Sequence, residues 1–353
     1  MNKKRIVLMA SEALIAPFEK EGCEVFWTLP LVYSLFYEGK DRVVSKTEEF
    51  TERLCSYRDK IFQFKPIYFF AEQWFFINLL SRLEPASRRK IASLWMDFIN
   101  DLKKEGIVTI IFCQDDPLPF SYFRKQDLTS LTYSFHMVAT HSLQMKALYK
   151  SHGQRIIYFP SFANFDFLNK TQHQEHEKVE PSILKFDLFF IGSMDRQRKI
   201  FFRLLSKKVK DLDYFFGCDK FYYTSRKNID FDIGNQYYLE QIYEKTSINV
   251  VYGSCADSVF RKTWGVSNRI LNIAYSHGFF LCDYRKHLVD LFDIDTRLYS
   301  FGSIHECHRK IRFYLERAQL RKELADKFHN QVMINYTANK VIEKLICDIE
   351  KNY

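Results

Sequence analysis

The feature that most constrains the fold of this chain is the alternation of short apolar runs with amphipathic helical patterns. The runs have strand length and comprise residues 6–9, 24–27, 65–70, 107–113, 137–140, 156–159, 186–191, 213–216, 248–252 and 279–282. Helical patterns separate several of them, as in residues 88–104, where Ile91, Trp95 and Leu102 share one face. Such alternation favours parallel sheets with helices on both faces, so we expect an α/β protein with doubly wound sheets. Residues 220–232 are polar and aromatic and predict no single element.

The length and a change in composition indicate two domains. A chain of 353 residues has room for about two cores of ordinary size. Residues 166–185 are rich in Asn, Lys, Gln, His and Glu, which is typical of a linker. We therefore expect a first domain over residues 1–165 and a second over 186–336. An amphipathic helix over residues 337–353 ends the chain and is expected to pack back on the first domain.

No segment predicts a membrane span, a disulfide framework or a bound cofactor. The apolar runs fall well short of the roughly 18 residues that cross a bilayer. Ser11 and Glu12 interrupt the apolar run that follows the basic residues at the start, so we expect a first strand rather than a signal peptide. The eight cysteines include no C-x-x-C pair and are expected to be reduced thiols of a cytoplasmic protein.

A formal net charge of +9 indicates an acidic partner. A nucleotide, a nucleic acid and an anionic membrane surface all satisfy this condition. The basic residues are spread along the chain rather than gathered in one run, which argues against a dedicated nucleic-acid surface.

The stretch over residues 265–285 predicts a helix, a tight turn and a strand. Ser267 suits the N-cap of a helix that runs to about His277, and Gly278 suits a left-handed position after it. The apolar residues 279–282 then form a buried strand. Free backbone N–H groups at the helix entrance favour an anion, and Arg269 in the first turn adds a forked donor for phosphate.

A second turn offers a similar anion site. Residues 186–191 form a strand, Gly192 and Ser193 the turn, and an amphipathic helix follows with Arg196 and Arg198 near its start. Either arginine could meet a diphosphate or simply lie on a solvated helix face. The turn carries neither a dinucleotide-binding glycine pattern nor a P-loop.

Candidate catalytic residues follow two strands of the first domain. Asp115 and Asp116 come directly after the strand over residues 107–113, at the edge where doubly wound sheets bind ligands. Either could deprotonate an acceptor hydroxyl or hold its hydroxyl groups, or the pair could form an Asx turn before Pro117. His141 follows the strand over residues 137–140 and could be a general base or a capping surface residue.

No metal site is expected. His173 and His176 lie in the linker, where no strand or helix fixes their geometry. Asp293 and Asp295 have the spacing of a metal-binding Asp-x-Asp pair, yet their position after Phe292 is more typical of a surface turn.

These segments resemble a known family. Residues 265–269, Gly278, residues 281–285 and residues 288–292 are similar to the C-terminal motif of CgeB-like group 1 glycosyltransferases, the spore maturation protein type. Residues 112–117 and the Gly192–Ser193 turn also have counterparts there. The resemblance implies a GT-B fold, in which two Rossmann-like doubly wound domains face a cleft. It places the acceptor on the first domain and a nucleotide-sugar donor on the second.

The same resemblance implies a set of donor-binding residues. Those beyond the Gly192 turn are Tyr252, Ser254, Arg261, Lys262, Gly265, Ser267, Asn268, Arg269 and Asn272. The family usually has Glu at the position of Asn272, where it contacts the donor ribose. Asn retains the ability to hydrogen-bond a hydroxyl.

The function expected from these observations is metal-independent transfer of a sugar from a nucleotide-diphospho-sugar to an acceptor hydroxyl. The acceptor could belong to a protein, a glycan or a lipid-linked molecule, and less readily to a nucleic acid. Two alternatives stay open. The net charge allows a phage-type glycosyltransferase that modifies nucleic-acid bases, and Asn272 allows a non-catalytic binding module on a degenerate GT-B scaffold.

Overall fold

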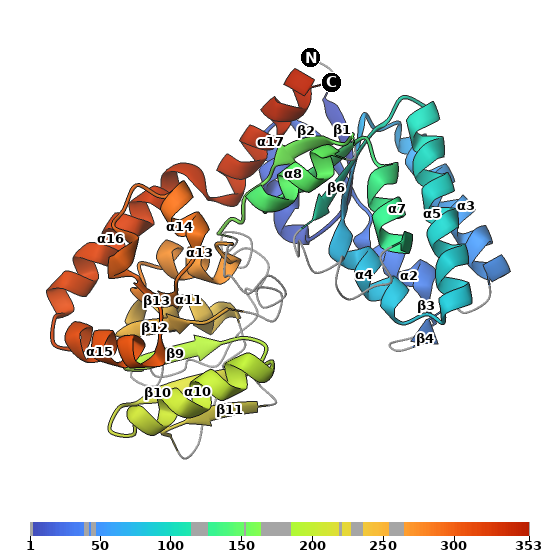
Figure 1. Ribbon diagram of the computed structural model, residues 1–353. Coiled ribbons are helices and arrows are strands. Elements are labelled where there is room, and N and C mark those ends of the chain that lie inside the picture. Colours follow the sequence, from blue (N-terminus) through green and yellow to red (C-terminus); the bar gives the residue numbers. More distant parts are fainter. Residues whose placement is uncertain are drawn as a thin grey trace. The chain divides into compact units, whose positions relative to one another are not determined.

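The computed structural model describes residues 3–38, 42–43, 47–113, 126–151, 153–163, 185–218, 221–226, 236–253 and 265–352. Its contacts divide the chain into two compact units (Figure 1). Unit 1 comprises Met1–Pro160 together with Ala338–Tyr353, and unit 2 comprises Ser161–Thr337. Each unit has its own parallel sheet and its own hydrophobic core. The expected linker over residues 166–185 lies almost wholly outside the described residues.

Unit 1 is built on a six-stranded sheet of order β2-β1-β5-β6-β7-β8 in which every neighbouring pair is parallel. Its strands are β1 (Lys4–Met9), β2 (Cys23–Trp27), β5 (Tyr68–Glu72), β6 (Val108–Cys113), β7 (Met137–Thr140) and β8 (Arg155–Tyr158). A small hairpin, β3 (Tyr37–Glu38) with β4 (Arg42–Val43), lies apart from it. Ile6 of β1 pairs with Val25 on one side and Tyr68 on the other, so the strand order reverses around β1. Such a reversal is the mark of a doubly wound sheet.

The helices of unit 1 bury an aromatic core around Trp95. They are η1 (Glu12–Leu14), α1 (Ile15–Lys20), α2 (Leu29–Phe36), α3 (Thr47–Phe64), α4 (Gln73–Ser81), α5 (Pro85–Lys104), α7 (Gln126–Ser134), α8 (Leu143–Ser151) and α17 (Ala338–Asn352). Trp95 on α5 is fully buried, and its ring lies 5.2 Å from the rings of Phe76 and Phe98. Helix α8 begins at Leu143, because Ser142 accepts the first turn's hydrogen bonds.

The last helix of the chain belongs to the first unit. α17 packs on α1 and β8, which lie far earlier in the sequence. Its apolar side chains at helical spacing, Val341, Leu345 and Ile349, are all buried. Lys4 of β1 and Glu350 of α17 form an ion pair at the two ends of the chain.

Unit 2 has a second six-stranded sheet, of order β11-β10-β9-β12-β13-β14. Its strands are β9 (Leu188–Ile191), β10 (Tyr214–Cys218), β11 (Phe221–Thr224), β12 (Ile248–Val251), β13 (Phe280–Asp283) and β14 (Ser300–Phe301). All neighbours are parallel except β11, which is antiparallel to β10. Its helices are α10 (Arg196–Lys208), α11 (Gln236–Lys245), α13 (Asn268–Tyr275), α14 (Lys286–Leu291), η2 (Thr296–Leu298), α15 (Ile304–Leu315) and α16 (Ala318–Asn335). α10 packs beside α15, whereas α13 packs beside α11 and α16.

One expectation for the turn after α13 is wrong in detail. The left-handed position is taken by His277, with a φ of 56°, and not by Gly278. Gly278 is required for a different reason, because a Cβ there would lie 2.5 Å from the Tyr243 carbonyl oxygen. At the other end of α13, Ser267 occupies the N-cap as predicted, and its side chain makes no capping hydrogen bond.

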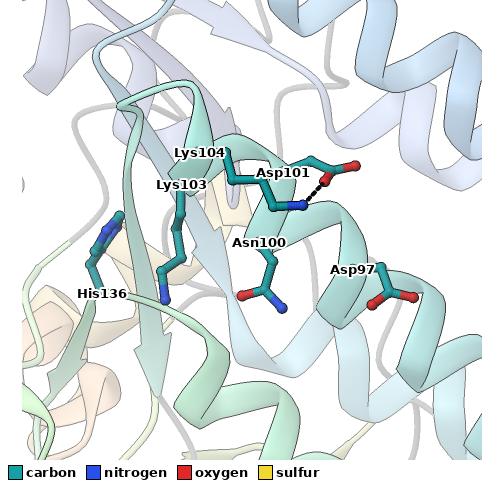
Figure 2. Close-up of a pocket in the computed structure, with 6 residues that line it drawn as sticks. All are labelled: Asp97, Asn100, Asp101, Lys103, Lys104 and His136. Carbon is teal, nitrogen blue, oxygen red and sulfur yellow. Dashed lines mark hydrogen bonds and ion pairs between the residues drawn. The ribbon is translucent and has the colours of Figure 1, made fainter.

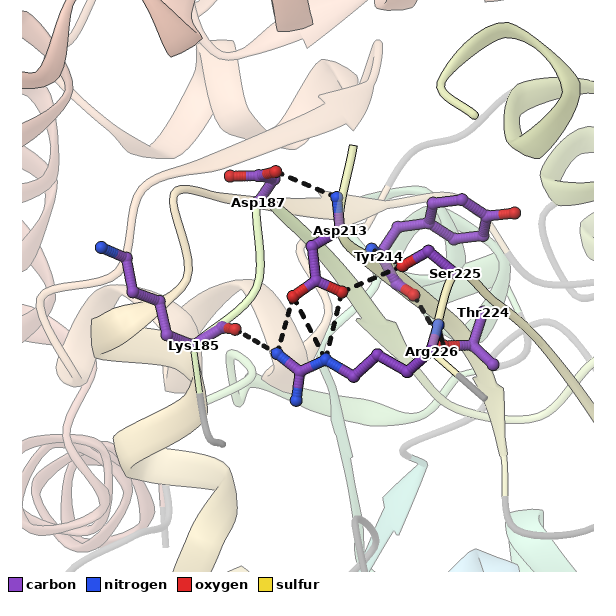
Figure 3. Close-up of polar contacts among 7 residues, drawn as sticks. All are labelled: Lys185, Asp187, Asp213, Tyr214, Thr224, Ser225 and Arg226. Atoms are coloured by element: carbon purple, nitrogen blue, oxygen red, sulfur yellow. Dashed lines mark hydrogen bonds and ion pairs between the residues drawn. The ribbon is translucent and has the colours of Figure 1, made fainter. Parts of the chain in front are cut away.

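A polar network closes the edge of the unit 2 sheet where β9 and β10 begin and β11 ends (Figure 3). The Arg226 guanidinium donates to both carboxylate oxygens of Asp213, at 2.7 and 3.1 Å, and to the carbonyl of Lys185. Its Cζ lies 3.8 Å from the centre of the Phe186 ring. Asp213 also accepts from the Ser225 hydroxyl at 2.9 Å. The network therefore ties the edge strand β11 to the start of β9.

Arg226→Gln is expected to lower the free energy of unfolding by about 1 kcal/mol, since it removes a forked ion pair at a half-exposed site. Chemical denaturation measures the effect. Arg297→Gln is the matched control, because its ion pair with Asp295 lies at the surface and spans only two residues. Equal effects of the two changes would show that the network adds nothing beyond a surface pair.

Candidate anion-binding site

The carboxyl ends of β9 and β12 meet at the point where the strand order of the unit 2 sheet reverses. β9 has β10 on one side and β12 on the other. From β9 the chain continues toward β10, and from β12 it continues in the opposite direction toward β13. In open parallel sheets ligands bind in the crevice at such a point. The loop after β9 carries Gly192 and Ser193, and the loop after β12 carries Tyr252 and Gly253.

Arg198 fastens these two loops together. Its Nε donates to the carbonyls of Tyr252 and Gly253, both at 3.1 Å, and its Nη1 donates to the carbonyl and hydroxyl of Ser193, both at 2.9 Å. Only 6% of the residue is exposed. The N-cap of the same helix is Asp195, whose carboxylate accepts from the backbone N–H groups of residues 197 and 198. Arg198 therefore positions the loops, and its Nε and Nη1 donors are used within the protein.

Arg269 reaches the same loop from the first turn of α13. A Cβ on Gly192 would lie 2.1 Å from Arg269 Nη2 and 2.9 Å from its Cζ, so the guanidinium lies directly against the glycine backbone. The φ of Gly192 is 149°, a conformation that side chains rarely adopt. The Phe190 ring lies under this group, with its centre 4.8 Å from Arg269 Cζ. Glycine at position 192 is thus what admits the guanidinium.

The charge of Arg269 lacks a carboxylate partner among the described residues. Burial lowers the pKa of Arg269 below its ordinary value, and Arg285 nearby lowers it further. The hydroxyl of Tyr243 on α11 is hydrogen-bonded to it and opposes this shift. A guanidinium held half-buried beside a second cation, with a neutral hydroxyl as its partner in the described ranges, favours the binding of an anion.

Arg285 and Asp283 hold the entrance of α13. Arg285 is 4% exposed, and its Nη2 donates to Asp283 Oδ1 at 2.9 Å. Its Nη1 donates to the carbonyl of Gly265 at 2.8 Å, just ahead of the α13 N-cap. Asp283 is the last residue of β13, so this pair fixes the helix entrance to the strand end. The helix therefore presents its free N–H groups at the same edge of the sheet.

The structure brings together five of the predicted donor-binding residues at this edge: Gly192, Ser193, Arg198, Tyr252 and Arg269. Gly265 contributes a carbonyl to the anchoring of Arg285, and Ser267, Asn268 and Asn272 lie at the start and middle of α13. Arg196 is exposed at the first residue of α10. Ser254, Arg261 and Lys262 lie outside the described residues.

Two further members of this site were not identified from the sequence, namely Tyr243 and the Asp283–Arg285 pair. Asp283 and Arg285 are the first charged residues after an apolar strand, and this position in the sequence could have indicated a role at the strand end. No sequence signal indicated Tyr243, because this residue approaches Arg269 from a helix that lies more than 20 residues earlier in the chain.

Comparison with known proteins agrees with this architecture. Residues 196–346 match a protein-family model described as glycosyl transferase-like. No curated protein matches the chain by sequence. A sucrose-phosphate synthase from Thermosynechococcus elongatus is 8% identical, with 99% of each chain covered and a TM-score of 0.59. Trehalose-6-phosphate synthase is 9% identical over 99% of each chain, with a TM-score of 0.52. T4 phage β-glucosyltransferase is 11% identical over 99% of this chain and 98% of that one, also with a TM-score of 0.52.

The fold is GT-B. Similarity at such low identity establishes the architecture, and the matched region shows that the sequence of unit 2 from α10 onward is glycosyltransferase-like. In both GT-B units the candidate residues follow the carboxyl ends of parallel strands.

On unit 1 the structure describes one of the three predicted catalytic residues. His141 follows β7, and its Nδ1 lies 3.2 Å from the carbonyl oxygen of Cys113 at the end of β6. A carbonyl only accepts, so Nδ1 carries the proton in this contact, and in the neutral ring Nε2 then carries the lone pair. Asp115 and Asp116 follow Cys113 in sequence and lie outside the described residues.

Of the Asp-x-Asp pair, Asp293 is exposed and Asp295 is engaged within the protein. Asp295 caps η2, accepting from the backbone N–H of Arg297 at 3.1 Å and pairing with its guanidinium at 2.9 Å. His173 and His176 belong to the undescribed part of the chain. Over the described ranges, His, Cys, Asp and Glu side chains form no group suited to a metal ion. Across the same ranges every helix falls short of the length or apolar character that a bilayer span needs.

A hollow of about 700 Å³ lies on unit 1 along the second half of α5 (Figure 2). Its lining residues are Asp97, Asn100, Asp101, Lys103, Lys104 and His136. His136 directly precedes β7, so the hollow lies at the amino ends of the strands, opposite the edge that bears His141. Several of its polar groups already have partners: Asp101 pairs with Lys104 at 2.9 Å, and Lys103 donates to the Ser134 carbonyl. None of the predicted site residues lines it.

His136 in this hollow predicts a pH dependence of stability. Its Nδ1 accepts the backbone N–H of Thr109 at 3.1 Å, and burial, with Lys103 and Arg155, lowers its pKa below 6.5. The unfolded chain therefore binds more protons than the folded chain as the pH falls below 6.5. We expect the free energy of unfolding to decrease through that range, and His136→Gln to flatten the decrease.

Chemical denaturation between about pH 7.5 and pH 5 measures this slope. His305→Gln on α15 is the control, since His305 is exposed. An unchanged slope in His136→Gln would contradict the assignment.

Proposed function

We propose that the protein transfers a sugar from a nucleotide-diphospho-sugar to an acceptor hydroxyl, with the donor diphosphate bound where β9 and β12 end in unit 2. The observation that carries this proposal is the Arg269 guanidinium, held against Gly192 without a carboxylate partner among the described residues. Holding a partly desolvated charge in the free protein costs free energy, and an anionic ligand offsets that cost.

The same edge supplies several contacts for a diphosphate. One charge pair at about 4 Å contributes on the order of 4 kcal/mol in surroundings of intermediate polarity. Arg269 supplies such a pair, and the N–H groups at the start of α13 add partial positive charge. The Ser193 hydroxyl already accepts from Arg198, so its own proton is available to a phosphate oxygen.

During transfer the bond between the sugar carbon and the diphosphate breaks, and negative charge grows on the departing diphosphate. Arg269 and the α13 entrance stabilise that charge in place of a metal ion. Asn272 lies one turn beyond Arg269 on α13, at the position assigned to the donor ribose, where its amide bonds a hydroxyl.

On the acceptor side we propose that His141 Nε2 takes the proton of the attacking hydroxyl, with Asp115 or Asp116 as the other candidate base. Donation of Nδ1–H to the Cys113 carbonyl orients the ring for this role.

The test of donor binding is the thermal stability of the protein with UDP, GDP, ADP, dTDP or CDP, first without metal and then with Mg²⁺. A ligand at about 100 times its dissociation constant adds roughly 2.7 kcal/mol of stability. The proposal requires one nucleotide to shift the melting temperature without metal. Release of that nucleoside diphosphate from the corresponding nucleotide-sugar, with candidate acceptors, then tests turnover.

These experiments also separate the two alternatives. Salt-sensitive binding to duplex DNA, with sugar incorporated into the DNA, would identify a nucleic-acid acceptor. A non-catalytic module would show no turnover with any acceptor, and Asn272→Glu would then strengthen nucleotide binding without restoring transfer.

His141→Gln is expected to lower kcat about 100-fold or more if His141 is the base, because a positioned proton acceptor contributes at least that factor. Nucleotide binding should be unchanged, since His141 belongs to unit 1 and the proposed nucleotide site to unit 2. Steady-state kinetics and the nucleotide-dependent melting temperature measure the two properties. His305→Gln is the control, and an unaltered kcat would transfer the role to Asp115 or Asp116.

A further inference from the structure

We propose that unit 2 binds the surface of an anionic lipid membrane through the outer side of α10 and the adjoining strand β11. The cationic–apolar face is defined as Lys199, Ile200, Arg203, Leu204 and Lys207 of α10 with Phe221 of β11. All six residues are exposed. This surface contributes nothing to the anion site described above, because the α10 residues that contact that site are Arg198 and Phe201, whose ring is stacked on Tyr252 at 4.0 Å, and neither belongs to this face.

The first support is charge. α10 carries six cationic residues and no carboxylate in 13 residues. Lys199, Arg203 and Lys207 follow each other at intervals of four and form one row along the exposed side. Among the described residues no carboxylate forms an ion pair with any of these three. A row of unneutralised cations on a rigid helix is complementary to a layer of anionic headgroups.

The second support is a row of apolar side chains directly beside the cations. Ile200 and Leu204 are 45% and 42% exposed and follow Lys199 and Arg203 at the same interval. Phe221 is 37% exposed on the edge strand, with Lys199 Nζ 4.5 Å from the centre of its ring. Helices that lie in a membrane interface combine cations with aliphatic and aromatic side chains in this way.

The opposite side of α10 explains why this face points to solvent. Phe201, Phe202 and Leu205 are buried in the core of unit 2, and Arg198 is bonded to two loops. The helix therefore cannot turn its apolar residues inward. β11 is equally fixed, because the Arg226–Asp213 network holds its end to the sheet, and Tyr223 donates its hydroxyl to the Lys199 carbonyl at 3.3 Å.

The aliphatic residues favour a membrane over a nucleic acid as the partner. Phosphates of either partner would attract the row of cations. Ile200 and Leu204 would stay exposed to water beside a nucleic acid and would gain little free energy there. At the boundary between headgroups and acyl chains they are removed from water, which is favourable.

The experiment is flotation of the full chain with vesicles of phosphatidylcholine alone and of phosphatidylcholine mixed with phosphatidylglycerol. We expect binding to the mixed vesicles only. The triple variant Lys199→Gln/Arg203→Gln/Lys207→Gln is expected to lower the vesicle partition coefficient roughly 100-fold, because each cation near the membrane surface contributes a factor of about five. Ile200→Ser/Leu204→Ser is expected to weaken it as well, although the net charge is unchanged.

The matched control is Arg309→Gln/Lys322→Gln/Lys327→Gln, which removes three exposed cations from α15 and α16 and changes the net charge equally. This variant should retain binding. Circular dichroism and thermal melting confirm that each variant is folded.

Failure of the wild-type chain to float with mixed vesicles would overturn the proposal. Equal losses in the control and in the cationic-face variant would also overturn it, because net charge alone would then explain binding. Duplex DNA binding that depends on Lys199, Arg203 and Lys207, without vesicle binding, would assign the face to nucleic acid instead.

Discussion

Arg269→Met is expected to abolish most of the nucleotide-dependent stabilisation while the free protein melts no lower than wild type. The substitution removes a half-buried charge without a carboxylate partner among the described residues and retains most of the side-chain volume. The hydrogen bond with Tyr243, which is lost, contributes about 1 kcal/mol to stability. The free energy gained by removing a desolvated charge offsets that loss. Residues that serve binding at the expense of stability behave in this way.

The loss of ligand binding should be large. Hydrogen bonds from a guanidinium to a charged acceptor contribute about 1.5–3 kcal/mol each, so the affinity is expected to fall about 100-fold. At a ligand concentration that adds roughly 2.7 kcal/mol to the wild type, the variant would gain only about 0.4 kcal/mol. Thermal melts with and without nucleotide measure both effects. Arg309→Met is the control, because it removes an exposed arginine of α15 far along the chain from the site.

A full nucleotide shift in Arg269→Met would exclude this arginine from the site. A free variant that melts several degrees below wild type would show that the guanidinium stabilises the fold, which contradicts its role as a charge held for a ligand.

Gly192→Ala is expected to weaken nucleotide binding and to destabilise the protein by about 1–3 kcal/mol. The φ of 149° is strained for alanine, and the new methyl group would lie 2.1 Å from Arg269 Nη2. The guanidinium must then leave the glycine backbone. Isothermal titration with the nucleotide and chemical denaturation measure the two consequences.

The steric part of this effect can be isolated. In the double variant Gly192→Ala/Arg269→Met the clash is relieved, so the two changes should couple by about 0.5–3 kcal/mol rather than add. Gly302→Ala is the control, since its methyl group would lie 3.5 Å from Glu306 Oε2, an ordinary contact. Additive effects of the two substitutions would contradict the close approach of Arg269 to Gly192.

The sequence was sufficient for the elements on which the site is built. β7 occupies the predicted residues, and β12, β13 and α13 begin or end within two residues of expectation, because apolar runs of four to six residues and a periodic helix are local signals. β11 was not assigned, since its Phe-Tyr-Tyr-Thr run lies among polar residues and becomes a strand through pairing with β10.

The roles of individual arginines could not be predicted in the same way. From the sequence, Arg198 and Arg269 are both predicted to donate hydrogen bonds to a phosphate near a helix entrance. In the structure Arg198 donates to carbonyls 54 and 55 residues further along the chain, whereas Arg269 has no carboxylate partner within the part of the chain that the structure describes. This difference depends on which loops the sheet order brings together. The position of Gly278 was likewise decided by the Tyr243 carbonyl of another helix rather than by the local turn.

The return of α17 to unit 1 has a consequence for synthesis on the ribosome. The N-terminal unit contains residues up to 160 and then lacks its last helix until residues 338–352 have emerged. Unit 2 is continuous in sequence, so all of its strands are available while α1 and β8 still await their partner helix. The nascent chain therefore exposes the apolar surface that Val341, Leu345 and Ile349 later cover, and completion of unit 1 is a late, long-range step. A truncation before Ala338 should leave this surface open to aggregation.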